Sequence, residues 1–178
     1  MKNRIFLVAA FIALPNVVCA EPVVTHCTDN EQTLFSCILK KHKTVSICAS
    51  KDMSPTSGYM QYRFGKLGKV EITIPKSQKG FPEITLQASK DSHAEYNSLN
   101  ISNGPFNYSL ESFRQLTPKN KDGYPTPASS DSLRVEDSRK SMREGNIAFS
   151  DDCASLVSPV DAATISRLTG KNIEKAGF

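Results

Sequence analysis

The sequence predicts an all-β domain, an antiparallel sandwich or barrel of about seven to nine strands, with a short C-terminal helix. From Thr33 onward, segments with alternating apolar and polar residues follow one another at short spacing. This period of two, rich in β-branched and aromatic residues, is typical of half-buried strands. Gly and Pro residues separate the segments, and a helix-start signal occurs only near residue 159.

Each expected strand is a short segment of this kind. The first two flank the basic turn at residues 40–43, and Asn103-Gly104-Pro105 is a tight-turn signal between two later ones. Seven strands are expected before residue 113, and two more before Cys153. The segments after the first pair are "YMQYRF", "KVEITI", "EITLQAS", "EYNSLNIS", "FNYSLES", "SLRVED" and "GNIAFS".

Two C-terminal segments depart from this pattern. Residues 117–132 are rich in Pro, Gly, Ser and Asn and contain Tyr124 as their single aromatic. Such a composition predicts a long exposed loop, which is either functional or a mobile connector. Ser158 as N-cap, a proline directly after it and Gly170 as terminator predict a helix over 159–169.

The first twenty residues have the three parts of a secretory signal peptide. A short basic start is followed by an unbroken apolar run over residues 5–14, and small residues precede Glu21. The apolar run is too short to span a bilayer as a permanent helix. We therefore expect residues 1–20 to be a cleaved signal peptide. Residues 21–178 are expected to form a single domain that is periplasmic or secreted, without stable membrane insertion.

The charge of the expected mature chain is nearly balanced. Two of the 22 basic residues lie in the signal peptide, which leaves 20 basic residues against 18 acidic ones. Domains that bind nucleic acid usually concentrate an excess of Lys and Arg on one face. The composition therefore predicts no nucleic-acid partner.

The cysteines indicate two disulfides. Cys19 is lost with the signal peptide, and a lipoprotein cleavage at this residue fits poorly because valine precedes it. An even set remains, Cys27, Cys37, Cys48 and Cys153, for which an exported chain has three connectivities. A structural zinc site would normally contain a C-x-x-C pair, and the sequence has none. No metal and no cofactor are predicted.

The stretch "FSCILKKHKTVSICAS", residues 35–50, bears on the connectivity. If Cys37 and Cys48 faced each other across a hairpin, the apolar residues of one strand would share a face with serines of the other. A register shifted by one residue groups the apolar residues of both strands on one face and points the two cysteines to opposite faces. We therefore expect the pairs Cys27–Cys37 and Cys48–Cys153.

The sequence contains one weak candidate for metal or acid–base chemistry. It has no G-x-S-x-G, S-x-x-K or H-E-x-x-H motif and no glycine-rich phosphate loop. In "DSHAEY", Asp91, His93 and Glu95 are spaced so that a strand would place them on one face. That arrangement would allow an envelope hydrolase or metal-dependent enzyme, but it is equally typical of an exposed polar strand start.

Four residues are candidates for binding another protein. Arg63 lies among aromatic residues in "YMQYRFG", and such arginines are frequent at interface hot spots, although an outward strand position explains it as well. Lys41 and Lys43 lie in an expected hairpin turn, where lysines usually keep a β protein soluble or attract an acidic partner. Tyr124 is the aromatic residue of the expected loop.

Four strings of the sequence resemble a group of small exported bacterial proteins of uncharacterised function. They are "FSC" at 35–37, "VSIC" at 45–48, "YRFGKLGKVE" at 62–71 and "GNIAFSDDC" at 145–153. The resemblance implies a protein of the bacterial envelope and supplies no catalytic residues. The inhibitory loop motifs of lysozyme-inhibitor families are not found in this sequence.

These observations favour an exported, non-enzymatic binding module that recognises another envelope or extracellular protein. An inhibitor or immunity role is the concrete form of this hypothesis. The alternatives are an enzyme that uses His93 with Asp91 or Glu95, and a structural or adhesive subunit that associates with itself.

Overall fold

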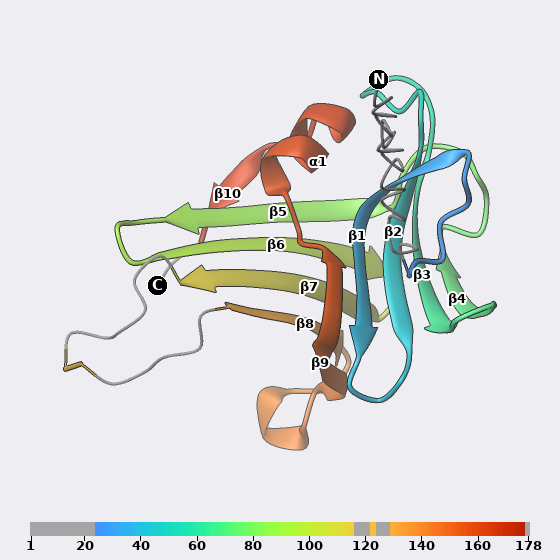
Figure 1. Ribbon diagram of the computed structural model, residues 1–178. Coiled ribbons are helices and arrows are strands. Elements are labelled where there is room, and N and C mark those ends of the chain that lie inside the picture. The colour runs from blue at the N-terminus through green and yellow to red at the C-terminus, as the bar shows by residue number, and fades with distance from the viewer. Residues whose placement is uncertain (1–23, 116–121, 124–128, 177–178) are drawn as a thin grey trace, which may run out of the picture.

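A single curled sheet of ten strands, in the form of a half-barrel, makes up most of the computed structural model, which describes residues 24–115, 122–123 and 129–176 (Figure 1). The expected signal peptide and Tyr124 lie outside the described residues. The strands are β1 (Glu31–Leu39), β2 (Thr44–Ser50), β3 (Met60–Lys66), β4 (Lys69–Ile74), β5 (Glu83–Lys90), β6 (Ala94–Asn103), β7 (Phe106–Gln115), β8 (Ser129–Asp137), β9 (Ile147–Ser158) and β10 (Ile173–Lys175). The prediction of an all-β fold with a short C-terminal helix is confirmed.

The strand order is β10-β5-β6-β7-β8-β9-β1-β2-β3-β4, and only the β10–β5 pair is parallel. Strand β9 joins the two halves of the sheet. Its first part pairs with β8 up to Asp152, and its second part pairs with β1 from Cys153 onward. Strands β1–β4 therefore curl against strands β5–β8, and the inward side chains of both halves form one core (Figure 1).

The hairpin of β1 and β2 has the register that groups its apolar residues. Phe35 pairs with Ile47 and Cys37 with Val45, and all four side chains are buried in the core. Cys48 lies on the opposite, outer face, so the two cysteines of this hairpin point away from each other as expected. The alternation of apolar residues was sufficient to predict the shared face but not the register, which is shifted by three residues from a direct Cys37–Cys48 pairing and not by one.

The expected disulfide pairs are wrong. The structure contains Cys27–Cys48 and Cys37–Cys153. The segment before β1 crosses the outer face of β2, which brings Cys27 to Cys48. On the inner side of β1, Leu39 pairs with Cys153 of β9, which brings that cysteine beside Cys37. The sequence does not show which strand the N-terminal segment crosses.

The same N-terminal segment explains why every residue of β2 is buried. The core covers the inner face of β2, and residues 24–28 cover its polar outer face. The backbone N–H of His26 donates to Ser46 Oγ (3.0 Å), and Ser36 Oγ donates to the carbonyl of Val24 (2.8 Å). Serines on an outward face are thus hydrogen-bonded rather than hydrated.

Helix α1 (Ala162–Thr169) begins later than expected. Strand β9 extends to Ser158, so this serine ends a strand and does not cap the helix. The N-cap is Asp161, whose carboxylate accepts the N–H of Thr164 (3.0 Å), and Gly170 ends the helix as predicted. The helix packs beside β5 and β6, at the end of the curl opposite the β1–β2 turn (Figure 1).

The expected loop over 117–132 is shorter than predicted at its C-terminal end. Residues 129–132 belong to β8, and Ser132 pairs with both Glu111 and Asp152. Ser129 and Ser132 lie opposite Arg114 and Glu111 of β7, and Ser130 lies opposite Phe113. The strand therefore forms without an apolar alternation at its start. Among the described residues, no helix is long and apolar enough to cross a membrane.

Candidate functional site: an aromatic pocket with a basic rim

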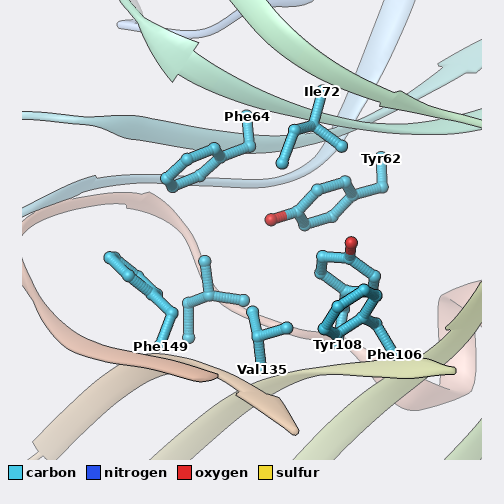
Figure 2. Close-up of a pocket in the computed structure, with 8 residues that line it drawn as sticks. Tyr62, Phe64, Ile72, Phe106, Tyr108, Val135 and Phe149 are labelled. Carbon is cyan, nitrogen blue, oxygen red and sulfur yellow. The ribbon is translucent and has the colours of Figure 1, made fainter. Parts of the chain in front are cut away.

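A pocket of about 320 Å³ lies inside the curl, between the two halves of the sheet. One half contributes side chains of β3 and β4, and the other contributes side chains of β7, β8 and the start of β9 (Figure 2). The lining residues are Tyr62, Phe64, Ile72, Phe106, Tyr108, Leu133, Val135 and Phe149. Five of these eight are aromatic, and the volume is at the lower end of the range for small-molecule sites.

Aromatic pairs line the pocket where the two halves meet. The ring centroids of Tyr62 and Tyr108 lie 5.1 Å apart, and those of Phe64 and Phe149 lie 5.6 Å apart in an edge-to-face arrangement. Such pairs add to the stability gained from burial alone. They hold the two halves at a fixed separation while a cavity remains between them.

Tyr62 presents a polar group to this apolar pocket. The residue is only 1% exposed, and its hydroxyl points into the space between the rings (Figure 2). Among the described residues this hydroxyl has no hydrogen-bond partner, and its oxygen is accessible from the pocket and not fully buried. Burial, and to a lesser degree the nearby Tyr108, raises the pKa of Tyr62 well above its usual value, so the hydroxyl stays protonated and can donate.

The mouth of the pocket is on the side where Ile72, Phe106 and Phe149 are only half-buried. Three cationic side chains lie over lining rings on this side. Lys41 Nζ is 4.8 Å from the centroid of Phe149, Lys43 Nζ is 5.4 Å from that of Phe64, and the Arg139 guanidinium is 5.5 Å from that of Phe106. We call Lys41, Lys43 and Arg139 the basic rim.

Two members of the basic rim have carboxylate partners. Lys43 pairs with Glu71, and Arg139 makes two bonds of 2.8 and 2.7 Å to Asp137. Hydrogen bonds from Arg139 lower the pKa of Asp137 to about 2, so this carboxylate is charged at neutral pH. These two rim cations are therefore largely neutralised by neighbours in the protein.

Lys41 differs from the other two rim residues. Its ammonium donates to the carbonyl oxygen of Ser150 (3.0 Å), and no carboxylate of the described residues lies within ion-pair distance of it. The carboxylate of Asp151 accepts the backbone N–H of Lys41 instead (2.9 Å). Lys41 thus carries a positive charge at the pocket mouth that no ion pair balances.

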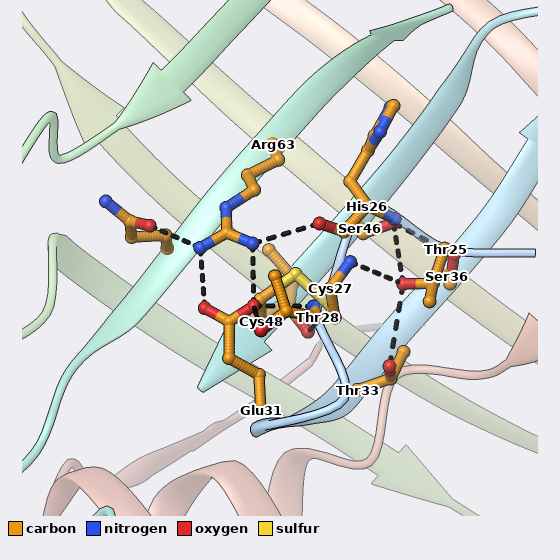
Figure 3. Close-up of a disulfide and its surroundings, with 12 residues drawn as sticks. Thr25, His26, Cys27, Thr28, Glu31, Thr33, Ser36, Ser46, Cys48 and Arg63 are labelled. Atoms are coloured by element: carbon orange, nitrogen blue, oxygen red, sulfur yellow. Dashed lines mark hydrogen bonds and ion pairs between the residues drawn. A yellow bond between two sulfur atoms is a disulfide. The ribbon is translucent and has the colours of Figure 1, made fainter. Parts of the chain in front are cut away.

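Arg63 does not lie on an accessible surface, contrary to its expected role in binding a partner. Its side chain is 9% exposed and forms a two-bond ion pair with Glu31 at 2.7 and 2.6 Å. The other N–H groups of Nη1 and Nη2 donate to the carbonyl of His26 and to the side-chain oxygen of Gln61 (Figure 3). Arg63 does point outward from β3, but the N-terminal segment covers it, and its role is structural.

The structure brings together two of the three residues of the expected metal or acid–base site, because His93 Nδ1 lies 3.9 Å from Asp91 Oδ1 while Glu95 has another partner. His93 lies in the exposed turn between β5 and β6, and Asp91 accepts the backbone N–H groups of His93 and Ala94. Glu95 forms an ion pair with Lys90 (2.9 Å). Among the described residues, no three His, Cys, Asp or Glu side chains cluster as metal ligands. The arrangement gives no support to the enzyme alternative.

Sequence reasoning identified Lys41 and Lys43 but missed the pocket beside them. The relevant signal is that three strands each have an aromatic residue close to one end. These residues are Phe64, Phe106 and Phe149. Each position by itself is typical of an ordinary core residue. Only the strand order places them at one end of the curl.

The fold and the pocket define a disulfide-bonded, half-barrel β protein with a preformed apolar cavity. Comparisons of the chain with protein-family models, with curated proteins and with solved structures found no match. The resemblance to small exported bacterial proteins therefore stays a prediction, and the function has to be inferred from the geometry.

Proposed function

We propose that the protein is an exported, non-enzymatic binding module of the bacterial envelope, and that the aromatic pocket holds the apolar part of its ligand. The observation that carries this proposal is a preformed cavity of about 320 Å³ lined by eight side chains, five of them aromatic. Ligand pockets are typically concave, preformed and mostly apolar, with a few polar groups. The Tyr62 hydroxyl, which points into the cavity, is such a polar group, and a ligand can accept its hydrogen bond in place of water.

Two further observations support the placement outside the cytoplasm. Both disulfides are formed, which fits an oxidising compartment. The signal-peptide pattern of residues 1–20 directs the chain there. A periplasmic or secreted binding protein is the assignment that combines these features with the pocket.

The neutral apolar fluorophore N-phenylnaphthylamine tests whether the pocket binds. We expect saturable binding with a fluorescence increase, because the probe leaves water for an aromatic cavity. Val135→Phe places a ring in the cavity and should weaken binding by about tenfold or more, since the added atoms occupy the space that the probe needs. Val157→Phe, on the part of β9 that pairs with β1 and outside the pocket, is the matched control and should bind as the unmodified protein does.

The proposal is wrong if the fluorophore does not bind saturably, or if Val135→Phe binds it normally while its near-ultraviolet circular dichroism shows an intact fold. Should Val135→Phe fail to fold, Leu133→Met provides a second variant at the pocket wall that nearly conserves volume. That variant should fold and change the affinity for the probe.

Recognition of another protein, with an inhibitor or immunity role, is a second candidate that one observation favours. Among the described residues, five large hydrophobic side chains are exposed, and four of them lie in two segments, residues 67–70 and 142–147. Large apolar groups exposed to water are candidates for contact with a partner protein. They are Leu67, Val70, Met142 and Ile147.

A further inference from the structure

We propose that the ligand of the pocket is an apolar anion, a carboxylate or phosphate ester whose apolar body enters the pocket and whose charge stays at the mouth beside Lys41. This inference rests on the proposed function, because it names the chemistry of the ligand for the same site. It is carried by three observations: the position of the basic rim, the difference between its cations, and the lining of the pocket.

The first observation is the position of the basic rim. All three cations lie within 5.5 Å of the centroids of rings that line the pocket. A ligand that contacts Phe64, Phe106 or Phe149 therefore ends close to a cation. A neutral ligand would gain nothing from this arrangement, and a cationic one would be repelled by it.

The second observation is that the cations are unequal. Glu71 and Asp137 already neutralise Lys43 and Arg139, whereas within the described part of the chain the ammonium of Lys41 has a carbonyl oxygen and a ring as partners and no carboxylate. An ammonium forms its strongest hydrogen bonds with an anionic acceptor. Lys41 is thus the residue that distinguishes an anionic ligand from a neutral one.

The third observation is the lining of the pocket. Six of its eight side chains carry no polar group, and all of its cations lie at the mouth. Burying a charge among apolar side chains is costly unless the charge is paired. The apolar body of the ligand therefore enters the pocket, and its charged group stays beside Lys41.

The charge of the surrounding turns agrees with this assignment. Residues 40–43, 66–71, 137–144 and 151–152 contain eight basic and five acidic side chains, an excess that the whole mature chain does not share. A local excess of positive charge raises the local concentration of anions and speeds their association.

Displacement of N-phenylnaphthylamine by three ligands with the same ten-carbon tail tests the inference. These are decanoate, decanol and decyltrimethylammonium, each used below its critical micelle concentration. We expect decanoate to bind about fivefold to tenfold more tightly than decanol, which is the gain that one partly exposed ion pair provides. The cationic ligand should bind most weakly of the three. Lysophosphatidylglycerol with a short acyl chain forms a fourth arm, which distinguishes a lipid phosphate headgroup from a free carboxylate.

The variants assign this preference to particular residues. Lys41→Gln should remove most of the advantage of decanoate over decanol, a ratio of two affinities that is measured on the same variant. Lys40→Gln is the matched control, because Lys40 is the neighbouring lysine but pairs with Asp152 and touches no lining ring. Tyr62→Phe removes the hydroxyl inside the pocket, so it should leave the preference for decanoate over decanol in place, because the charged group of the ligand stays at the mouth.

Two results would overturn the inference. One is equal binding of decanoate and decanol by the unmodified protein, and the other is an identical loss of decanoate affinity in Lys40→Gln and Lys41→Gln. Either result, with N-phenylnaphthylamine still bound, leaves the proposed function intact and removes only the anionic ligand. Failure of N-phenylnaphthylamine to bind would instead remove the proposed function itself.

Discussion

Glu31 and Arg63 form the most completely bonded ion pair of the described structure, on the outer face of the sheet beneath the N-terminal segment (Figure 3). Besides Arg63, the Glu31 carboxylate accepts the Tyr59 hydroxyl (2.7 Å) and the backbone N–H of Thr28 (2.8 Å). A buried charge is tolerable only when it is paired and hydrogen-bonded in this way. The network therefore fixes the N-terminal segment on β2 and β3.

The pKa of Glu31 leads to a prediction for stability at acid pH. Burial alone would raise this pKa, but the hydrogen bonds from Arg63, Thr28 and Tyr59 outweigh it and lower the pKa from 4.5 to about 2. A carboxyl whose pKa is lower in the folded than in the unfolded chain stabilises the fold at any pH above the unfolded pKa. This contribution, about 3 kcal/mol, is lost as the pH falls from about 4.5 to about 2. Glu31→Gln should thus be less stable than the unmodified protein by about 3 kcal/mol at neutral pH, and the difference should vanish near pH 2.

Urea denaturation at a series of pH values measures this difference. Glu83→Gln, at an exposed position at the start of β5, serves as the control and should change stability by less than about 0.5 kcal/mol at any pH. A deficit for Glu31→Gln that stays constant from neutral to acid pH would contradict the assignment.

Arg63 also shows what a sequence pattern cannot supply at the scale of a residue. Its outward position on β3 follows from the alternation of the strand, and that part of the interpretation is confirmed. Its burial follows from a segment 37 residues earlier in the chain, which provides the carbonyl of His26 as an acceptor. Contacts between segments that far apart leave no local pattern.

At the scale of the elements, the strands that alternate regularly were predicted closely. The structure has seven strands up to Gln115, and β4 has the predicted bounds. Strand β10 was missed because its three residues are all exposed and have no apolar alternation. Strand β9 was expected to end before Cys153, but it extends to Ser158 because it changes partner from β8 to β1 at this point.

The β3–β4 hairpin contains an irregularity that positions the pocket. The register shifts between Phe64 and Gly65, and the lining residues Phe64 and Ile72 face each other beside this shift. A side chain at Gly65 would meet backbone, since a Cβ there would lie 2.3 Å from the carbonyl oxygen of Lys69. The hairpin can close in this register only with glycine at this position.

Gly65→Ala should therefore destabilise the protein by about 3 kcal/mol and weaken N-phenylnaphthylamine binding, because the backbone of β4 has to move. Gly68→Ala is the matched control in the same hairpin. Gly68 has a φ of +76° and open space around it, so alanine there adds backbone strain of about 1 kcal/mol and no clash. Thermal unfolding and probe titration of both variants test this, and equal effects of the two substitutions would contradict it.

At the scale of the whole molecule, the pocket exists because the sheet curls without closing. Tyr62 and Leu133 lie 71 positions apart in the sequence and meet across the curl. The fold class could be predicted from alternation, because alternation is local. The pocket could not, because the curvature depends on bulges, on the partner exchange of β9 and on disulfide pairing, which single strands do not encode.

The two disulfides contribute differently to this architecture. Cys27–Cys48 attaches the N-terminal segment to the outer face and spans 21 residues, whereas Cys37–Cys153 joins β1 to β9 and spans 116 residues. A cross-link stabilises mainly by restricting the unfolded chain, and more so for a longer loop. The longer bond also lies where β9 passes from one half of the sheet to the other.

The last prediction separates these two contributions. Replacing Cys37 and Cys153 by alanine should lower the free energy of unfolding by about 5 kcal/mol, and replacing Cys27 and Cys48 should lower it by about 3 kcal/mol. Both pairs include a fully buried cysteine, so the packing losses are comparable. Only the first pair holds β1 against β9, and only its removal should weaken N-phenylnaphthylamine binding, because the two halves can then separate. Equal probe affinity in the two double variants, measured where both are folded, would show that the curl is maintained by packing alone.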